Sequence, residues 1–381
     1  ASVSMALYTP AMPALIAAFG TTMAMVKWSL TAYFAGFALA QLVCGPLSDA
    51  FGRRPVAFGF LALYTVSGAV AGLAGTVEIL IGARLVQGVG AAVGVAVSRA
   101  VVRDLFTGQE SAKVMNSIGI VLAVGPAVAP TIGGLLSEAF GWRAVFLAMT
   151  VFGAGALAAV FLALPETNRS PNRELARPGR VLATYRRLIV DRRFLAPALS
   201  IAFSVGPVYS LGTMLPFVLI DRVGLTPTAF GLGMLAQTGS FFVGGLVARR
   251  LLAVVAADRL VLPALIFSFA GASATLAIGV LWPATYISVM IPVGVFAFSM
   301  ALVIPASTTA AMAPFPTIAG SASALLGFLQ MGAGFLGGLA ATTFADPITG
   351  LKTVFPTMLA VSVAAGVWQR RILAATRPAA E

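Results

Sequence analysis

Long apolar runs recur along this chain and constrain its fold more than any other feature. About twelve runs reach roughly 20 residues, the length that an α-helix needs to cross the hydrocarbon core of a bilayer. Hydrophobic residues make up 59% of the chain and charged residues 9%, which is not the composition of a soluble domain. The sequence therefore predicts an all-α membrane protein with one transmembrane helix for each run: 3–19, 27–47, 56–75, 79–101, 112–136, 143–164, 195–219, 228–248, 260–281, 285–305, 320–343 and 352–369.

The chain has a net charge of +12, and its basic residues gather in every second loop between the apolar runs. Basic residues favour the cytoplasmic side, so this pattern predicts that both termini lie in the cytoplasm. It favours contact with anionic membrane lipids over binding of nucleic acid. The predicted outer loops hold only Lys27, Arg143, Arg222 and Lys352, and the predicted inner side holds Arg53, Arg54, Arg103, Lys113, the Arg-rich 169–193 loop, Arg249, Arg250, Arg259, Arg370, Arg371 and Arg377.

The longest polar stretch, Glu166 to Arg193, separates six runs from six runs. It predicts an N-terminal bundle over 1–165, a cytoplasmic loop over 166–194 and a C-terminal bundle over 195–381. The first run starts at the first residue, so we expect a polar segment to precede this numbering. The single cysteine, Cys44, cannot form an intramolecular disulfide and is expected to pack as a small apolar residue.

The junction GPLSDAFGRRP, Gly45 to Pro55, combines Asp49, Gly52 and the pair Arg53-Arg54 between two apolar runs. It resembles motif A of the major facilitator superfamily, although Ala50 replaces the basic residue that usually follows the Asp. The resemblance implies the major facilitator fold: twelve transmembrane helices in two pseudo-symmetric six-helix bundles, with substrate bound between the bundles. It also implies that Asp49 lies against the helix that starts near Ala319, while Arg53 pairs with Asp104.

Two further motifs point to the same superfamily. Arg84, Gln87, Gly88 and Gly90 resemble motif B of proton-coupled exporters, and an Arg inside hydrocarbon is expected to face the bundle interior. This Arg is predicted either to take part in proton coupling or to be structural. The fifth run resembles motif C of antiporters, where prolines bend the helix and glycines allow close contact. The gating residues implied by motifs A and C are Asp49, Arg53, Asp104, Pro126, Pro130, Gly133 and Gly134.

Several segments narrow the resemblance to the bicyclomycin-resistance and chloramphenicol-exporter (Bcr/CflA) group. They are Ser2–Pro13, Tyr33–Arg54, Arg99–Asp104, Pro165–Thr167 and Gly320–Ala324. The resemblance implies a drug exporter, coupled to protons, in the bacterial inner membrane.

One departure from this group concerns the proton. Where its first helix carries an Asp, this chain has Ala6, and every acid of the chain falls in a predicted loop or at a helix end. Either coupling uses an end-of-helix acid, or the transporter is uncoupled, or position 6 carries an engineered Asp→Ala change. The residues assigned to coupling are Arg84 and position 6.

The lack of acids in the predicted spans also bears on the substrate. An organic cation would need a counter-charge in a cavity of low dielectric, whereas the expected cavity charges are Arg84 and Arg99. Small neutral or weakly anionic amphipathic compounds are therefore favoured. Adaptable apolar and polar side chains predicted to line the cavity, each of which could equally be packing, are Met5, Tyr8, Met12, Tyr33, Phe37, Tyr209, Met214, Gln237 and Gln330.

Other classes of function are weighed against export. A membrane enzyme needs convergent catalytic groups, and this chain has no His and no acid predicted inside the spans. A channel fits the motifs poorly. The strongest rival is an uncoupled facilitator or importer of a small metabolite. We expect a monomer with no cofactor and no metal, whose partners are its substrate, membrane lipids and, if it is coupled, protons.

Overall fold

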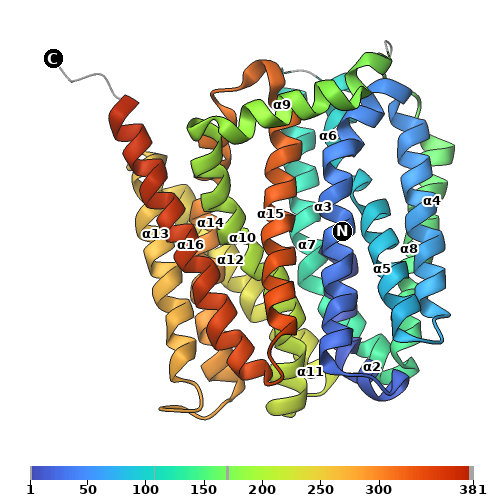
Figure 1. The fold of residues 1–381 in the computed structure, drawn as a ribbon, viewed down its shortest axis with the longest axis vertical. Helices are drawn as coiled ribbons and strands as arrows, with labels where there is room; N and C mark the ends of the chain where they lie inside the picture. The colour runs from blue at the N-terminus through green and yellow to red at the C-terminus, as the bar shows by residue number, and fades with distance from the viewer. Residues whose placement is uncertain (1, 107, 169–170, 377–381) are drawn as a thin grey trace. The chain divides into compact units, whose positions relative to one another are not determined.

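The computed structural model describes residues 2–106, 108–168 and 171–376, which are almost entirely helical (Figure 1). Within these ranges, eleven helical segments are long and apolar enough to cross a membrane, judged by length and composition. The predicted fifth run corresponds to one further helix, α7, of 33 residues. Arg169, Arg377 and Glu381, which the sequence assigned to the cytoplasmic side or to loops, lie outside the described residues.

The helices of the first half follow the predicted runs closely. Pro10 and Pro13 divide the first run, since a proline removes a backbone hydrogen bond, and a short 3₁₀ turn joins the two pieces. Thr22 and Thr76 begin two of the helices by accepting backbone N–H groups on their hydroxyls. The bounds are α1 Ser2–Tyr8, η1 Thr9–Ala11, α2 Met12–Phe19, α3 Met23–Phe51, α4 Arg53–Gly72, α5 Val77–Ala91, α6 Val93–Leu105, α7 Gly108–Phe140 and α8 Trp142–Ala163.

The second half follows its runs in the same way, and the polar stretch between the halves also contains helix. The bounds are η2 Arg173–Ala176, α9 Pro178–Val190, α10 Arg192–Pro216, η3 Phe217–Arg222, α11 Pro227–Gly233, α12 Leu235–Leu251, α13 Ala257–Ser273, η4 Ala274–Ala277, α14 Tyr286–Met312, η5 Pro316–Ile318, α15 Ala319–Thr342 and α16 Pro347–Thr376. Helix α9 buries Tyr185 and Leu188 and exposes its arginines. The sequence prediction treated this segment only as a loop.

Two sequence expectations meet different outcomes. Lys27, expected in an outer loop, lies within α3 and is 0% exposed, because α3 begins four residues before it. Cys44 is a free, buried thiol, as predicted.

The described chain forms two compact units, and each has its own core. Unit 1 comprises residues 1–184 and 225–232, and unit 2 comprises residues 185–224 and 233–381. Several helix pairings of unit 1 recur in unit 2. In unit 1, α1 packs on α7, α5 on α3 and α4, and α4 on α8; in unit 2, α10 packs on α15, α14 on α12 and α13, and α13 on α16. This correspondence agrees with an internal duplication of six helices.

Helices α3 and α5 are neighbours in unit 1 (Figure 1), and glycines set the distance between them. A Cβ at Gly36 would lie 2.0 Å from the Leu85 carbonyl oxygen, and a Cβ at Gly88 would lie 2.1 Å from the Tyr33 carbonyl oxygen. In unit 2, a Cβ at Gly244 of α12 would lie 2.3 Å from the Phe298 carbonyl oxygen of α14. Small residues allow this approach, and helix association in lipid depends on such packing.

Gly88→Ala is expected to destabilise unit 1, because the new methyl group would meet a backbone carbonyl that cannot move aside. Overpacking of this kind typically costs about 1–3 kcal/mol. Thermal unfolding of the purified protein in detergent measures the effect. The matched control is Gly82→Ala on the same helix, where no other atom lies within 4 Å of the new Cβ. Equal melting temperatures for the two variants would contradict the assigned close contact.

Candidate functional site

Arg84 is the largest fully buried side chain in the described residues, with 0% of its surface exposed. It lies in the second turn of α5, on the same face of that helix as Gln87. Its Nη1 donates a hydrogen bond of 2.6 Å to Gln87 Oε1. The same Nη1 lies 3.9 Å from the sulfur of Met149, on α8.

Aromatic rings enclose this guanidinium. Its central carbon lies 4.6 Å from the ring centre of Tyr8 and 4.3 Å from that of Tyr33. The Tyr8 hydroxyl shares a hydrogen bond of 2.6 Å with Ser29 Oγ, and its ring lies 5.4 Å from the ring of Phe146. Helices α1, α3, α5 and α8 therefore all contribute to one buried site in unit 1.

The charge of Arg84 has no acidic partner among the residues that the structure describes. Its Nε and Nη2 are buried and have no hydrogen-bond acceptor there. Other arginines, at positions 53, 177, 180, 193 and 222, form ion pairs with acids of the described chain. Contact with aromatic rings supplies about 2 kcal/mol when desolvated, whereas burying an ion costs several kcal/mol, so the site holds an uncompensated cation.

The structure brings only some of the predicted substrate residues to this site. Tyr8 and Tyr33 touch Arg84, and Phe37 packs on Tyr33 with 6.4 Å between ring centres. Met5, Ala6 and Met12 are buried on the helices of the first run. The remaining predicted side chains, Tyr209, Met214, Gln237 and Gln330, belong to unit 2, and their binding role stays a prediction.

Arg99 was predicted to contribute a second charge to the cavity. A break at Ala92 separates α5 from α6 within the span Val77–Val102, and Arg99 lies exposed on α6. Its place in the cavity stays a prediction. Glycines around the break, Gly90 and Gly94, have low helix propensity and weaken the helix there.

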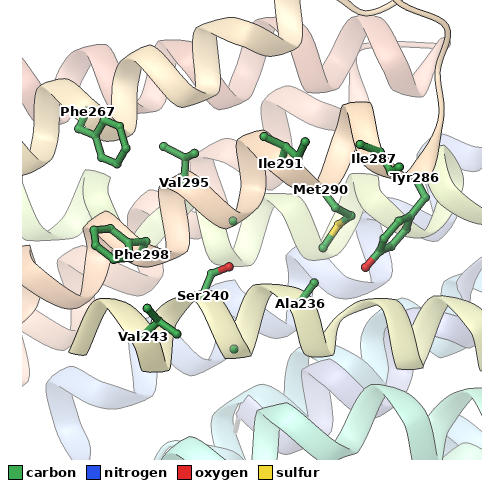
Figure 2. Close-up of a pocket in the computed structure, with 12 residues that line it drawn as sticks. Ala236, Ser240, Val243, Phe267, Tyr286, Ile287, Met290, Ile291, Val295 and Phe298 are labelled. Atoms are coloured by element: carbon green, nitrogen blue, oxygen red, sulfur yellow. The ribbon is translucent and has the colours of Figure 1, made fainter. Parts of the chain in front are cut away.

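Unit 2 contains an open groove of about 700 Å³ between α12, α13 and α14 (Figure 2). Ser240 and Val243 face Met290, Ile291 and other side chains of α14 across it (Figure 2). The predicted substrate residues are not among the twelve residues that line it. Its lining is mostly apolar, which suits hydrocarbon rather than a charged ligand.

The motif A junction forms the predicted ion pair. Arg53 is 6% exposed, and its Nε donates to Asp104 Oδ2 at 2.9 Å. Its Nη1 donates to Asp49 Oδ1 and, at 2.9 Å, to Ser48 Oγ. This arginine, unlike Arg84, is surrounded by acceptors. The gating role of Asp49, Arg53 and Asp104 stays a prediction.

The segment after α8 forms hydrogen bonds with this junction. The sequence analysis did not predict these contacts. Glu166 accepts the backbone N–H groups of Arg53 at 2.9 Å and Arg54 at 3.1 Å, so its carboxylate caps the start of α4. Asn168 Nδ2 donates to the carbonyl oxygen of Asp49 at 2.9 Å. A Cβ at Gly52, whose φ is +101°, would lie 2.5 Å from Glu166 Oε2, so this position requires glycine. The start of the polar stretch at Glu166 was the available signal.

Motif C packs α7 tightly within unit 1. Pro126 and Pro130 lie inside α7, and a Cβ at Gly133 would lie 2.1 Å from the Leu7 carbonyl oxygen on α1. A Cβ at Gly134 would lie 2.3 Å from the carbonyl oxygen of Pro227, in the later segment that belongs to unit 1. The glycines thus allow the close contacts expected of them, while their gating role stays a prediction.

Comparison with known proteins places this geometry in a family. The model of the Major Facilitator Superfamily matches residues 1–338. The chain belongs to the Major Facilitator Superfamily. It is therefore a multi-pass membrane transporter, and the superfamily consists of transporters of small molecules rather than enzymes.

Relatives and solved structures of the superfamily agree. An uncharacterized MFS-type transporter of Bacillus subtilis, YdgK, is 31% identical over 85% of this chain and 81% of its own length. A bicyclomycin resistance protein homolog of Haemophilus influenzae is 28% identical over 89% and 85%, which confirms the predicted resemblance. A bacterial homolog of the human lysosomal transporter Spinster, 16% identical, shares the fold with a TM-score of 0.72 over 100% of this chain and 96% of its own.

Glu166→Gln is expected to destabilise unit 1 by about 1 kcal/mol, because a neutral amide is a poorer partner for backbone N–H groups at a helix start. Thermal unfolding in detergent measures the loss. Glu174→Gln is the control, since its ion pair with Arg177 is exposed and such pairs contribute about 0–1 kcal/mol. An unfolding temperature for Glu166→Gln that equals the control value would contradict the cap.

Proposed function

We propose that this major facilitator exports small neutral or weakly anionic amphipathic compounds, such as amphenicol-like or bicyclomycin-like antibiotics, by alternating access. The observation that carries the proposal is the Arg84 site, where a buried cation lies among aromatic rings without an acid among the described residues. A second cation brought near this site would be repelled. The relative from Haemophilus influenzae, named for bicyclomycin resistance, supports a drug as substrate.

The direction and place of transport form part of the same proposal. Motif C resembles that of exporters, and its Gly133 and Gly134 sit in the close contacts that such a motif needs. The alternation of basic loops favours both termini in the cytoplasm, and the bacterial relatives favour a bacterial inner membrane. The competing function is an uncoupled facilitator or importer of a small metabolite, which the relative YdgK, a transporter without a stated substrate, leaves open.

Expression of the chain in a bacterium that lacks its own drug pumps should raise tolerance to a neutral amphenicol but not to a permanent cation. Arg84→Gln should reduce this tolerance at equal membrane abundance, because it changes the polarity of the buried site. Arg143→Gln is the matched control: Arg143 also contacts a ring, that of Trp142 at 4.3 Å, but it is exposed. Resistance to permanent cations alone would contradict the electrostatic argument.

Proton coupling is proposed for a form of the site in which an Asp occupies position 6, as in the group that this chain resembles. A carboxylate there would be disfavoured in its charged form by burial and favoured by a nearby guanidinium, so its protonation could follow the opening of the cavity. Ala6 is 5% exposed in the first helix, and Tyr8, two residues later, touches Arg84.

Ala6→Asp should make uptake of the transported drug into inverted vesicles depend on the proton gradient. The unchanged chain should respond little. Both forms are compared with and without a protonophore, and Ala6→Asn controls for size and polarity. If the unchanged chain proved fully sensitive to the protonophore, another acid would carry the proton, and Glu78 and Asp104 would be examined first.

A further inference from the structure

The donors of Arg84 are not used equally. Nη1 is engaged by Gln87 Oε1, whereas Nε and Nη2 have no acceptor among the described residues. Nε and Nη2 lie along one edge of the guanidinium plane and point their N–H groups in the same direction. That edge is the one with which arginine commonly binds an anion through two parallel hydrogen bonds.

The protein itself does not supply an anion to this edge within its described parts. Of the twelve acids in the chain, only Glu381 lies outside the described residues. Asp49, Asp104, Glu174, Asp191 and Asp346 each form an ion pair with an arginine other than Arg84.

The positive charge of Arg84 is neutralised neither by the tyrosines around it nor by loss of its own proton. The hydroxyl of Tyr8 is shared with Ser29, and both tyrosines offer their ring faces to Arg84. An arginine does not lose its proton in a protein. A buried, permanently charged donor edge therefore requires an acceptor that carries negative charge.

We propose that the Nε–Nη2 edge of Arg84 binds a small monovalent anion. The complete burial of Arg84 restricts the ligand to a small group. Two sources share this chemistry: an inorganic ion such as chloride, or the carboxylate of a small organic acid. The bound anion neutralises the core of unit 1. This inference does not rest on the proposed export activity, because it concerns the charge balance of the folded protein.

Thermal unfolding of the full chain in detergent tests the proposal. Sodium chloride and sodium acetate are titrated separately, with sodium sulfate holding the ionic strength constant. The melting temperature should rise by a few degrees and then saturate, as expected for a ligand that binds only the folded state. Saturation with chloride identifies an inorganic ion, and saturation with acetate alone identifies a carboxylate.

Two variants locate the effect. Gln87→Glu is nearly isosteric and places a carboxylate oxygen where Oε1 now lies, 2.6 Å from Arg84 Nη1. The saturable rise should disappear in this variant, because the protein then carries its own counter-charge. Arg84→Gln should also lose the rise, and Arg143→Gln, which alters an exposed arginine, should retain it. If Arg84→Gln does not fold, the loss or retention of the rise in Gln87→Glu alone shows whether the anion binds at Arg84.

Two results would overturn the proposal. One is the absence of a saturable rise with either salt in the unchanged chain. The other is a rise that persists unchanged in Gln87→Glu, since the anion would then bind elsewhere. Either result would leave the charge of Arg84 uncompensated, as the electrostatic argument for export assumes, and the tolerance assay measures export separately.

Discussion

The close contact of α3 with α5 is the constraint on which the rest of unit 1 depends. In a bilayer, helices gain little from burying apolar surface against one another, so backbone approach and internal hydrogen bonds must hold them together. Gly36 and Gly88 each face a carbonyl oxygen of the other helix. The backbone of Tyr33 packs against Gly88 of α5, so the ring of Tyr33 lies over Arg84, one helical turn before Gly88. The buried charge is thus positioned by packing between glycines.

Arg53 and Arg84 are both buried in unit 1, but their surroundings are opposite. Arg53 is surrounded by Asp49, Asp104 and Ser48, so its charge is balanced and its position is fixed. Arg84 lies deeper and meets two rings, an amide and a sulfur atom. Buried charges in proteins usually have a partner of opposite charge, as Arg53 does, whereas Arg84 has no acidic partner among the described residues. Exceptions of this kind concentrate at functional positions.

Sequence reasoning predicted the helices well, because hydrocarbon thickness fixes their length: α8, Trp142–Ala163, nearly coincides with the predicted 143–164. The resemblance to motif A also predicted the Arg53–Asp104 pair. The surroundings of Arg84 could not be predicted fully. An apolar side chain in a transmembrane helix gives no sign in the sequence of which residue it contacts, so Met149 was missed. The break at Ala92, between α5 and α6, was not predicted, because a one-residue interruption is too local for a hydropathy pattern to reveal.

The Glu166 cap has a consequence for biogenesis. The two N–H groups that it satisfies belong to Arg53 and Arg54, at the start of α4, yet the carboxylate itself follows α8 in the chain. A polypeptide emerges from the ribosome from its N-terminus, so α4 enters the membrane long before its cap exists. The junction between α3 and α4 can reach its final form only after the first half has been synthesised. The hydrogen bonds of Glu166 therefore form only when all the helices from α1 to α8 have been synthesised.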